Sequence, residues 1–372
     1  MKLVLICGAG YFSGKERMSL LLLKKLKEFH INICCITSIW GDGDFNKMLE
    51  KEKIVYVQMP IGFISKVIEV KPLLMTIHQL LYLPRLWIQY YRYIKLQNPD
   101  VIIHTNFHHA ILLLPFINVR KKNIYYLHEN VSNKKFYLSI FKIFQNRFNK
   151  FIGVSDFVSD TLVKCNIPIH KVTTIHNCIE LHKVENRIKQ NTRLLKIGIV
   201  GQVEEWKGHE DLLVAISILK KRGFHNLKCL IVGKGSNLFK QYLIDRIKVL
   251  NIREEVSFEG FKKSLDDIYT GLDIVCVPSR FNEPFGLSAL EPANYSIPVI
   301  ATNTGGLPEI IINNHSGILV SPHDALGLAQ ELEKLIIDVE LRNKLGKNSR
   351  IRLEEKFSSQ TFIKKWITEI FE

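Results

Sequence analysis

The chain has 372 residues, an apolar fraction of 47% and a formal net charge of +15. This length exceeds what one hydrophobic core usually supports, and the composition excludes an intrinsically disordered chain, so we expect two globular domains. The longest apolar run covers residues 110–119. It is about half of the roughly 20 residues that a membrane-spanning helix needs, which argues against an integral membrane protein.

The positive charge is concentrated in the first half of the chain. Residues 1–180 carry 24 Lys+Arg and 12 Asp+Glu, a net charge of +12, whereas the remaining residues carry +3. A basic face favours anionic partners such as nucleic acid, anionic lipid or a phosphorylated substrate. A Lys-, Ile- and Asn-rich composition inherited from an AT-rich genome explains the total charge equally well, but it does not explain the asymmetry.

The cysteines and the start of the chain indicate a cytoplasmic protein. There are seven cysteines, an odd number, and none has the spacing of metal ligands. We interpret them as buried, reduced thiols. The first strand-like segment begins at Lys2, so we expect no signal peptide.

Short apolar runs alternate with longer helical patterns along the chain. Several runs are apolar throughout, as parallel strands buried on both faces should be. The predicted strands cover residues 2–7, 31–37, 53–58, 101–104, 123–127, 151–154, 172–175, 196–200, 228–232, 256–258, 273–277, 299–301 and 318–320. Helices are expected between them, for example at 16–29, 211–222 and 238–250. This alternation predicts an α/β fold of two doubly wound domains with parallel sheets, facing each other across a cleft.

A polar, Lys- and Asn-rich segment at 180–193 interrupts the alternation and is the predicted linker. We therefore expect one domain over residues 1–182 and a second over 183–356. A last helix is predicted at 357–372, because apolar residues recur there at helical spacing.

Three short motifs in the first half are candidate ligand sites. Residues 13–17 follow the first strand, and Gly14 would let a backbone N–H approach a ligand at a helix start. A plain helix cap by Ser13 explains the motif as well. Residues 42–44 (Asp-Gly-Asp) are interpreted as a turn, and the pair at 108–109 (His-His) lacks a third metal ligand at a plausible spacing.

Segment 62–96 mixes basic and aromatic side chains. The basic residues are Lys66, Lys71, Arg85, Arg92 and Lys95, and the aromatic ones are Phe63, Tyr82, Trp87, Tyr90, Tyr91 and Tyr93. Such a stretch can lie on an anionic membrane surface. The alternative, weighted equally, is that the aromatic side chains fill the core of the domain.

Two further motifs stand at predicted strand ends. His128 ends the strand at 123–127, where a lone histidine is more often structural than catalytic. Lys207 lies between the strand at 196–200 and the next helix. An ammonium there can bind a phosphate, although a solvated lysine is the more frequent interpretation.

The most informative stretch covers residues 279–309. Glu283 and Glu291 flank a Pro-Phe-Gly-Leu turn that opens a helix, and a double-glycine loop follows at 304–309. A strand that turns through glycine into a helix start directs backbone N–H groups and a positive dipole end at one point. That arrangement suits a phosphate, and the carboxylates can accept hydrogen bonds from hydroxyls. We therefore predict a ligand that is both phosphorylated and polyhydroxylated. A helix with incidental acidic residues would not explain the matched order of strand, turn, helix and loop.

Together these motifs resemble the retaining, nucleotide-sugar-dependent glycosyltransferases of family 4 (group 1), which have two Rossmann-like domains in the GT-B architecture. Glu283 and Glu291 match the two glutamates of that family, and residues 304–309 match the loop that follows. Lys207 matches the Lys-Gly of the loop that opens the second domain. The resemblance covers nearly the whole chain.

The first half and the last helix carry the rest of the resemblance. Residues 13–17 look like the family's N-terminal Gly-Gly-x-Glu-Arg, with Ser13 in place of a glycine, and His128 looks like the histidine of its His-Asp pair. The helix at 357–372 is similar to the family's last helix, which crosses back onto the first domain. Residues 177–178 are Asn-Cys where Asn-Gly is usual.

The resemblance implies a donor site in the second domain. Glu291 would bind the hydroxyls of the nucleotide ribose, and Glu283 would contact the hydroxyls of the donor sugar. Backbone N–H groups of Phe285, Gly286 and Leu287 would hold the sugar and the diphosphate.

It also implies how the diphosphate is neutralised. Lys207 would supply the charge, helped by the N–H of Gly14, and His128 would border the donor sugar. Gln202 stands beside the diphosphate where the family often has an arginine, so Lys207 would have to supply more of the charge. Glu283, His128 and Lys207 are thus the candidate catalytic residues.

The implied reaction is transfer of a hexose-type sugar with retention at the anomeric carbon, without a metal or a cofactor. The donor would be a nucleotide-diphosphate sugar, a UDP-sugar rather than a GDP-sugar. The acceptor would be a glycan or a lipid-linked glycan in bacterial cell-surface polysaccharide synthesis (capsule, O-antigen or lipopolysaccharide). The basic first domain would bind it at the inner face of the cytoplasmic membrane.

The alternative function is a non-catalytic sugar- or nucleic-acid-binding protein on the same fold. The sequence shows no zinc-ligand spacing, helix-turn-helix or RNA-recognition pattern, so we expect no nucleic-acid partner. The presence of Glu283, Glu291 and Lys207 argues against a protein that only senses sugars.

Overall fold

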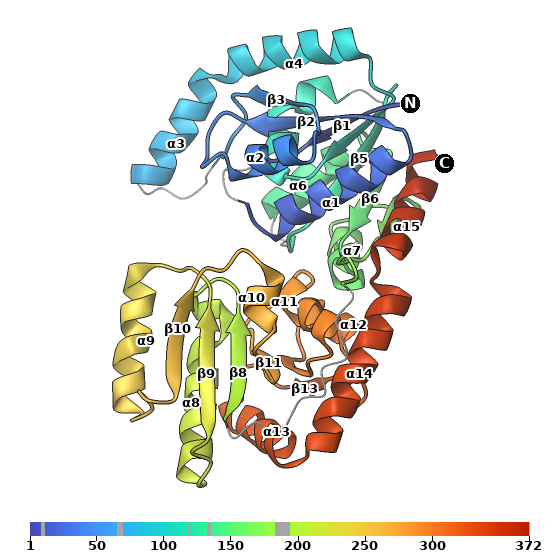
Figure 1. Ribbon diagram of the computed structural model, residues 1–372. Coiled ribbons are helices and arrows are strands. Elements are labelled where there is room, and N and C mark those ends of the chain that lie inside the picture. Colours follow the sequence, from blue (N-terminus) through green and yellow to red (C-terminus); the bar gives the residue numbers. More distant parts are fainter. Residues whose placement is uncertain (9–11, 65–69, 118–119, 132–134, 183–193, 372) are drawn as a thin grey trace. The chain divides into compact units, whose positions relative to one another are not determined.

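The computed structural model describes residues 1–8, 12–64, 70–117, 120–131, 135–182 and 194–371. The chain forms two compact units (Figure 1). The first contains Met1–His176 and Phe362–Glu372, and the second contains Asn177–Thr361. Most of the predicted linker at 180–193 lies outside the described residues.

The first unit is built on a seven-stranded sheet in the order β3-β2-β1-β4-β5-β6-β7. Every neighbouring pair is parallel, as the apolar runs predicted. The strands are β1 (Lys2–Ile6), β2 (Asn32–Ser38), β3 (Tyr56–Met59), β4 (Val101–His104), β5 (Lys122–Leu127), β6 (Lys150–Gly153) and β7 (Val172–Thr174).

Helices connect these strands. They are α1 (Gly14–Glu28), α2 (Asp44–Lys51), α3 (Val70–Leu81), α4 (Leu83–Gln97), α5 (Phe107–Leu112), α6 (Lys135–Phe144) and α7 (Asp156–Lys164), with 3-10 helices at Leu114–Phe116 and Ile169–Lys171. Leu86 and Tyr90 of α4 pack on the sheet residues Val4, Ile6 and Ile102. The α4 part of segment 62–96 therefore does contribute to the core.

The last helix, α15 (Ser359–Phe371), packs on the first sheet. The buried Trp366 ring meets the Tyr126 ring of β5 edge to face, with centroids 4.8 Å apart. Lys150 of β6 forms an ion pair with Glu369 at 3.2 Å. The helix begins at Ser359, not at 357 as predicted, because the Ser358 hydroxyl accepts a hydrogen bond from the Thr361 N–H at 3.3 Å and so caps a new helix.

The second unit has a six-stranded parallel sheet in the order β10-β9-β8-β11-β12-β13. Its strands are β8 (Leu195–Val200), β9 (Leu227–Val232), β10 (Val256–Gly260), β11 (Ile274–Val277), β12 (Val299–Thr302) and β13 (Ile318–Val320). Its helices are α8 (His209–Lys221), α9 (Asn237–Val249), α10 (Leu265–Tyr269), α11 (Leu287–Leu290), α12 (Leu307–Ile310), α13 (Ala325–Ile337) and α14 (Val339–Lys356), with 3-10 helices at Glu205–Lys207 and Glu291–Tyr295.

The two sheets confirm the predicted α/β fold with two doubly wound parallel-sheet domains. In each sheet the strands point the same way, so the loops at their carboxyl ends gather at one edge, where ligands bind in this class of fold. The loops of Gly14 and His128 follow β1 and β5. The loops of Lys207 and Glu283 follow β8 and β11.

None of the described helices combines the length and the apolar character that crossing a bilayer requires.

Candidate functional site

Glu283 is a buried carboxylate that two other loops hold in place. The residue is 4% exposed. One oxygen, Oε1, accepts hydrogen bonds from the Ser279 hydroxyl at 2.7 Å and from the Lys207 ammonium at 2.5 Å. The Ser279 carbonyl in turn accepts a hydrogen bond from the Thr302 hydroxyl of β12 at 2.8 Å. Burying a carboxylate is costly unless its oxygens are paired and hydrogen-bonded, so these contacts offset the cost of placing Glu283 inside the protein.

Lys207 lies at the end of the 3-10 helix Glu205–Lys207, just before α8. Its Nζ atom is 4.2 Å from the centre of the Trp206 ring, a cation–π contact. The next residue, Gly208, has a φ of +73°, and a Cβ atom there would lie 1.8 Å from the Pro278 carbonyl oxygen. Only glycine fits this position. The close approach brings the Lys207 loop against the end of β11, which explains why Lys207 reaches Glu283.

A second contact ties the same two loops together. Arg280 donates to both Asp211 oxygens, at 2.9 and 2.7 Å, in a bidentate ion pair. Its backbone N–H donates to the Trp206 carbonyl at 2.8 Å. A planar guanidinium fixes geometry as well as charge in such a pair, so Arg280 holds the β11 loop in register with the start of α8.

The turn after Glu283 depends on three glycines. Gly286 has a φ of +105°, which permits the turn into α11. A Cβ atom on Gly305 would lie 2.2 Å from the Glu283 carbonyl oxygen, and the Gly306 N–H donates to that same oxygen at 2.8 Å. The double-glycine loop therefore packs directly against the Glu283 backbone.

The helix that opens at this turn is one turn long. It covers Leu287–Leu290 and continues as the 3-10 helix Glu291–Tyr295, which has Pro292 in its first turn. The first N–H groups of a helix have no partner within it. Those of Leu287 and Ser288 thus lie at the start of a very short helix, next to the Glu283 backbone.

Glu291 is the second buried carboxylate of the stretch, and it is 5% exposed. Its Oε2 atom accepts a hydrogen bond from the Tyr269 hydroxyl at 2.7 Å. Tyr269 ends α10 and is fully buried. Sequence reasoning missed Tyr269 because it precedes Glu291 by 22 residues and belongs to no recognisable motif. It also gave no role to Ser279, although that residue stands within the motif.

In the first unit, residues 13–17 form the start of α1. Ser13 is the N-cap residue, as one of the two interpretations predicted, and its N–H donates to the Glu16 carboxylate at 3.2 Å. The Lys15 ammonium lies 3.4 Å from Glu16 Oε1. Gly14 is exposed as the first residue of the helix.

His128 follows β5, and its ring lies 4.0 Å from the Tyr126 ring, centre to centre. Desolvation, and then the positive charge of Lys15, lowers the pKa of His128 well below its ordinary value. The imidazole is therefore neutral at physiological pH and can exchange hydrogen bonds without carrying charge.

In the second unit, several of the predicted site residues lie close together in the structure. Lys207 and Glu283 touch, and Phe285, Gly286 and Leu287 lie between Glu283 and Glu291 in the turn. Gln202 is exposed in the loop after β8. The site offers an ammonium, two buried carboxylates and helix-start N–H groups, which is a suitable set for an anion that carries hydroxyl groups.

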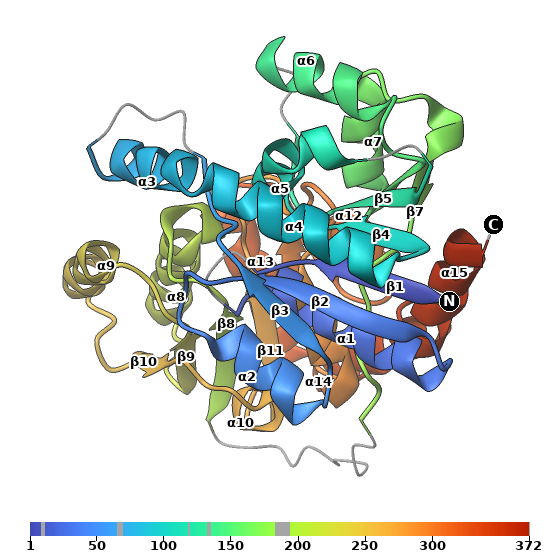
Figure 2. The same ribbon diagram turned by 90° about the horizontal axis from the view of Figure 1, so that it is seen from above.

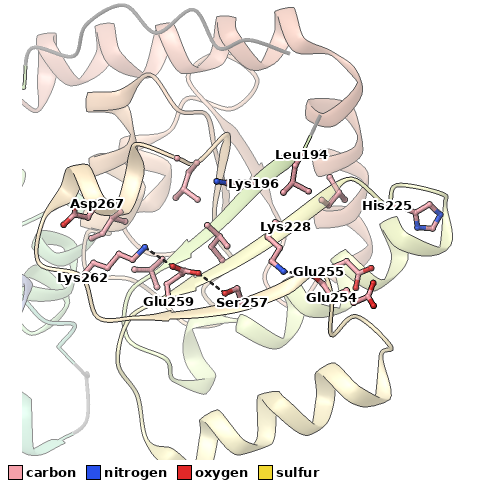
Figure 3. Close-up of a pocket in the computed structure, with 16 residues that line it drawn as sticks. Leu194, Lys196, His225, Lys228, Glu254, Glu255, Ser257, Glu259, Lys262 and Asp267 are labelled. Atoms are coloured by element: carbon pink, nitrogen blue, oxygen red, sulfur yellow. Dashed lines mark hydrogen bonds and ion pairs between the residues drawn. The ribbon is translucent and has the colours of Figure 1, made fainter. Parts of the chain in front are cut away.

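A cavity of about 660 Å³ elsewhere in the second unit contains none of these residues. It lies along β8, β9 and β10 (Figure 3). Two of its lysines have partners within the cavity lining: Lys262 pairs with Glu259 at 3.0 Å, and Lys228 donates to the Glu254 carbonyl at 2.6 Å. We assign no function to it.

Comparison with known proteins identifies the family. Residues 13–183 match the model of Glycosyltransferase Family 4, and residues 182–352 match the model of Glycosyl transferases group 1. The chain belongs to the group 1 glycosyltransferases. This confirms the family inferred from Glu283, Glu291 and the loops around them.

Two relatives illustrate the match. The capsular polysaccharide biosynthesis glycosyltransferase CapM of Staphylococcus aureus is 29% identical over 224 residues, which cover 56% of this chain and 58% of CapM. The D-inositol 3-phosphate glycosyltransferase of Corynebacterium jeikeium is 36% identical over 156 residues, which cover 40% of this chain and 37% of the relative. The matched regions thus span from about a third to just over half of these relatives.

Among solved structures, HepE of Anabaena in complex with UDP and glucose is similar over 100% of both chains, with a TM-score of 0.82 and 18% identity. This likeness supports the same GT-B type of fold for the present group 1 glycosyltransferase.

Proposed function

We propose that this glycosyltransferase transfers a hexose-type sugar, with retention at the anomeric carbon, from a UDP-sugar to a glycan or lipid-linked acceptor of a bacterial cell-surface polysaccharide. The observation that carries the proposal is the pair of buried carboxylates, Glu283 and Glu291, at either end of a helix start that Lys207 adjoins. The complex of HepE with UDP and glucose supports the donor class, and the name of CapM supports the pathway.

The chemistry of Lys207 suits a diphosphate. An ammonium has three N–H donors, and Glu283 accepts one of them. The other two would bind oxygens of the donor diphosphate, together with the backbone N–H groups of Phe285, Gly286 and Leu287. Charge then develops on the leaving diphosphate as the bond to the anomeric carbon breaks, and a preorganised cation stabilises it without solvent rearrangement. We therefore propose that transfer needs neither a metal ion nor a cofactor.

The new bond forms between the acceptor oxygen and the anomeric carbon on the face that the diphosphate leaves. The acceptor hydroxyl proton passes to the departing diphosphate oxygen, so no protein base is required. Glu283 would bind donor-sugar hydroxyls and Glu291 the ribose hydroxyls. Gln202 would donate a hydrogen bond to the diphosphate. We propose further roles for two residues of the first unit, the Gly14 N–H at the diphosphate and the neutral His128 beside the sugar.

The substitution Glu291→Ala tests the donor site. Removing hydrogen bonds to a charged carboxylate costs about 1.5–3 kcal/mol, so the affinity for UDP should fall by about 10- to 100-fold. Isothermal titration with UDP measures this loss.

A thermal-shift screen across UDP-, GDP- and ADP-sugars identifies the nucleotide base of the donor, because a ligand that binds the folded state stabilises it.

Glu255→Ala is the matched control. Glu255 is also buried, at 7% exposure, and forms an ion pair with Lys220 at 2.8 Å, but it precedes β10 at the opposite edge of the sheet. The Glu255→Ala substitution should lower the free energy of unfolding and leave the affinity for UDP unchanged. If Glu291→Ala bound UDP as tightly as the unmodified protein does, the assigned site would be refuted. If the unmodified protein bound UDP-sugars but never turned them over, a non-catalytic binding protein would be favoured.

A further inference from the structure

Helix α3 directs its apolar side chains away from the protein's own core. Leu74 and Leu81 are 59% and 74% exposed, and Leu73, Met75, Ile77 and Leu80 are exposed as well. Within residues 72–81, the part of α3 whose burial is described, the buried residue is a polar one, Gln79, and its side-chain amide donates to the Pro60 carbonyl at 3.1 Å. The helix is therefore inverted with respect to an ordinary surface helix, which buries its apolar stripe.

The spacing of these residues forms one continuous apolar face. Leu74, Ile77 and Leu81 are three and four residues apart, so they lie above one another on the same side of the helix. Leu73 and Leu80 flank them. Contiguous exposed apolar surface of this kind marks a site where something else covers the protein.

The next helix, α4, adds positive charge beside this face. Figure 2 shows α3 continuing beyond α4, away from the sheet that α4 covers. Arg85, Arg92 and Lys95 are exposed on α4 and lie at helical spacing with the exposed Ile88. Residues 70–99 contain no Asp or Glu. Among the described residues, no ion pair joins these three cations to an acidic group.

The charge decides which partner fits. A second copy of the chain, placed on the same face about a two-fold axis, would bring these cations against each other, and like charges oppose association. An anionic lipid surface offers both an apolar interior for α3 and phosphates for α4. Exposed tyrosine side chains such as Tyr91 suit the boundary between lipid and water.

We propose that α3 inserts its Leu74–Ile77–Leu81 face into the headgroup region of an anionic membrane, while Arg85, Arg92 and Lys95 bind the lipid phosphates. The proposal deepens the proposed function, since a lipid-linked acceptor is presented at such a surface. It is nevertheless tested by vesicle binding, which requires no sugar transfer.

The experiment is flotation of the full-length protein with phosphatidylcholine vesicles that either contain or lack phosphatidylglycerol, at low and high ionic strength. Wild type should float with the anionic vesicles at low salt, float less at high salt, and remain in solution with neutral ones. Leu74→Glu with Leu81→Glu should abolish flotation. Arg85→Gln with Arg92→Gln should weaken it by about tenfold or more, because each basic residue near an anionic surface contributes about fivefold.

Matched controls come from the second unit. Leu238 and Val249 of α9 are 85% and 75% exposed, so Leu238→Glu with Val249→Glu makes the same change on another surface. Lys221 and Arg253 are exposed as well, so Lys221→Gln with Arg253→Gln removes two positive charges from another surface. Both control pairs should float like wild type. Unchanged UDP affinity in all variants shows that they are folded and separates this test from that of the donor site.

Three results would overturn the proposal. Wild type could fail to float with anionic vesicles at low salt, or the Leu74 and Leu81 double variant could float as well as wild type. The protein could instead form a dimer in sedimentation that the same double variant abolishes, with no vesicle binding by wild type, which would assign the face to a second copy.

Discussion

At the scale of single residues, the proposed site includes side chains that position its two carboxylates and do not contact the substrate themselves. Ser279 and Tyr269 each give one hydrogen bond to a buried carboxylate. Such a bond both offsets the cost of burial and selects one rotamer of the carboxylate. The two residues thus fix the positions of Glu283 and Glu291, which we propose to bind the donor sugar and the ribose.

The substitution Ser279→Ala should separate positioning from binding. It removes one of the two donors to Glu283 Oε1 and leaves the Lys207 contact in place. Because a hydrogen bond to a charged group contributes about 1.5–3 kcal/mol, we expect kcat to fall by about tenfold or more. The Kd for UDP should stay within about twofold, since Glu283 is proposed to contact the sugar and not the nucleotide.

Ser279→Thr restores a hydroxyl and should recover part of the activity. Ser349→Ala, which removes another buried serine hydroxyl that donates to the Gly346 carbonyl at 2.7 Å, is the control and should not affect turnover. A loss of UDP affinity as large as the loss of kcat in Ser279→Ala would show that Ser279 has a general structural role.

At the scale of elements, the strands of both sheets were predicted from the sequence to within a few residues. Parallel strands buried on both faces are apolar throughout, and β4 and β13 have the predicted bounds. The glycine-rich loops were also predicted, because only glycine permits such close backbone approaches.

What the sequence did not predict depends on contacts between distant residues. The Lys207–Glu283 contact joins positions 76 apart, and nothing local to either residue indicates it. The outward direction of α3 is another example. Its apolar pattern would suit a buried helix equally well, and the burial of Gln79 and the contact of His78 with the Trp40 ring show which side faces the protein. The start of α15 was misplaced because Phe357, which is apolar and buried, ends the preceding helix instead.

The packing of the double-glycine loop on the Glu283 backbone leads to a prediction for Gly305→Ala. Gly305 has a φ of +59°, and a Cβ atom would lie 2.2 Å from the Glu283 carbonyl oxygen and 2.5 Å from its nitrogen. The backbone of Glu283 must then move. Since a displacement of about 1 Å in a catalytic group can cost about 100-fold in rate, we expect turnover to fall by that order.

Gly260→Ala is the matched control for this change. Gly260 has a φ of +68°, and no heavy atom lies within 4 Å of its added Cβ. It therefore carries the same backbone strain, about 1–2 kcal/mol, without the clash. Urea unfolding should show a loss of that size, with normal turnover. Equal effects of the two substitutions on turnover would mean that strain, and not contact with Glu283, explains the glycine.

At the scale of the whole molecule, each unit buries histidines that are neutral in the folded state near physiological pH. His104 in the first unit and His209 in the second are buried, and burial lowers the pKa of each to about 4. His109 is also buried, and its pKa is well below the ordinary value. Both units therefore depend on neutral imidazoles.

This dependence predicts that the protein loses stability in mild acid. In the unfolded chain these histidines titrate near pH 6.5, so between about pH 6.5 and 4 the unfolded state binds more protons than the folded one. The stability that these neutral histidines contribute is therefore complete above about pH 6.5, and the free energy of unfolding falls as the pH decreases below that value. A depression to about 4 corresponds to about 3 kcal/mol for each of His104 and His209 once the pH is below 4.

Urea unfolding at several pH values between 7.5 and about 5 measures the slope in a range where the histidines dominate. Carboxylates with lowered pKa values, such as Glu210, lose their contribution only below their ordinary value of 4.5. The variant His104→Gln should flatten the slope for the first unit and His209→Gln for the second, whatever their effect on absolute stability. Because both slopes come from proton uptake by the unfolded chain, a free energy of unfolding that stays constant from pH 7.5 to 5 would contradict the assignment of neutral, buried histidines.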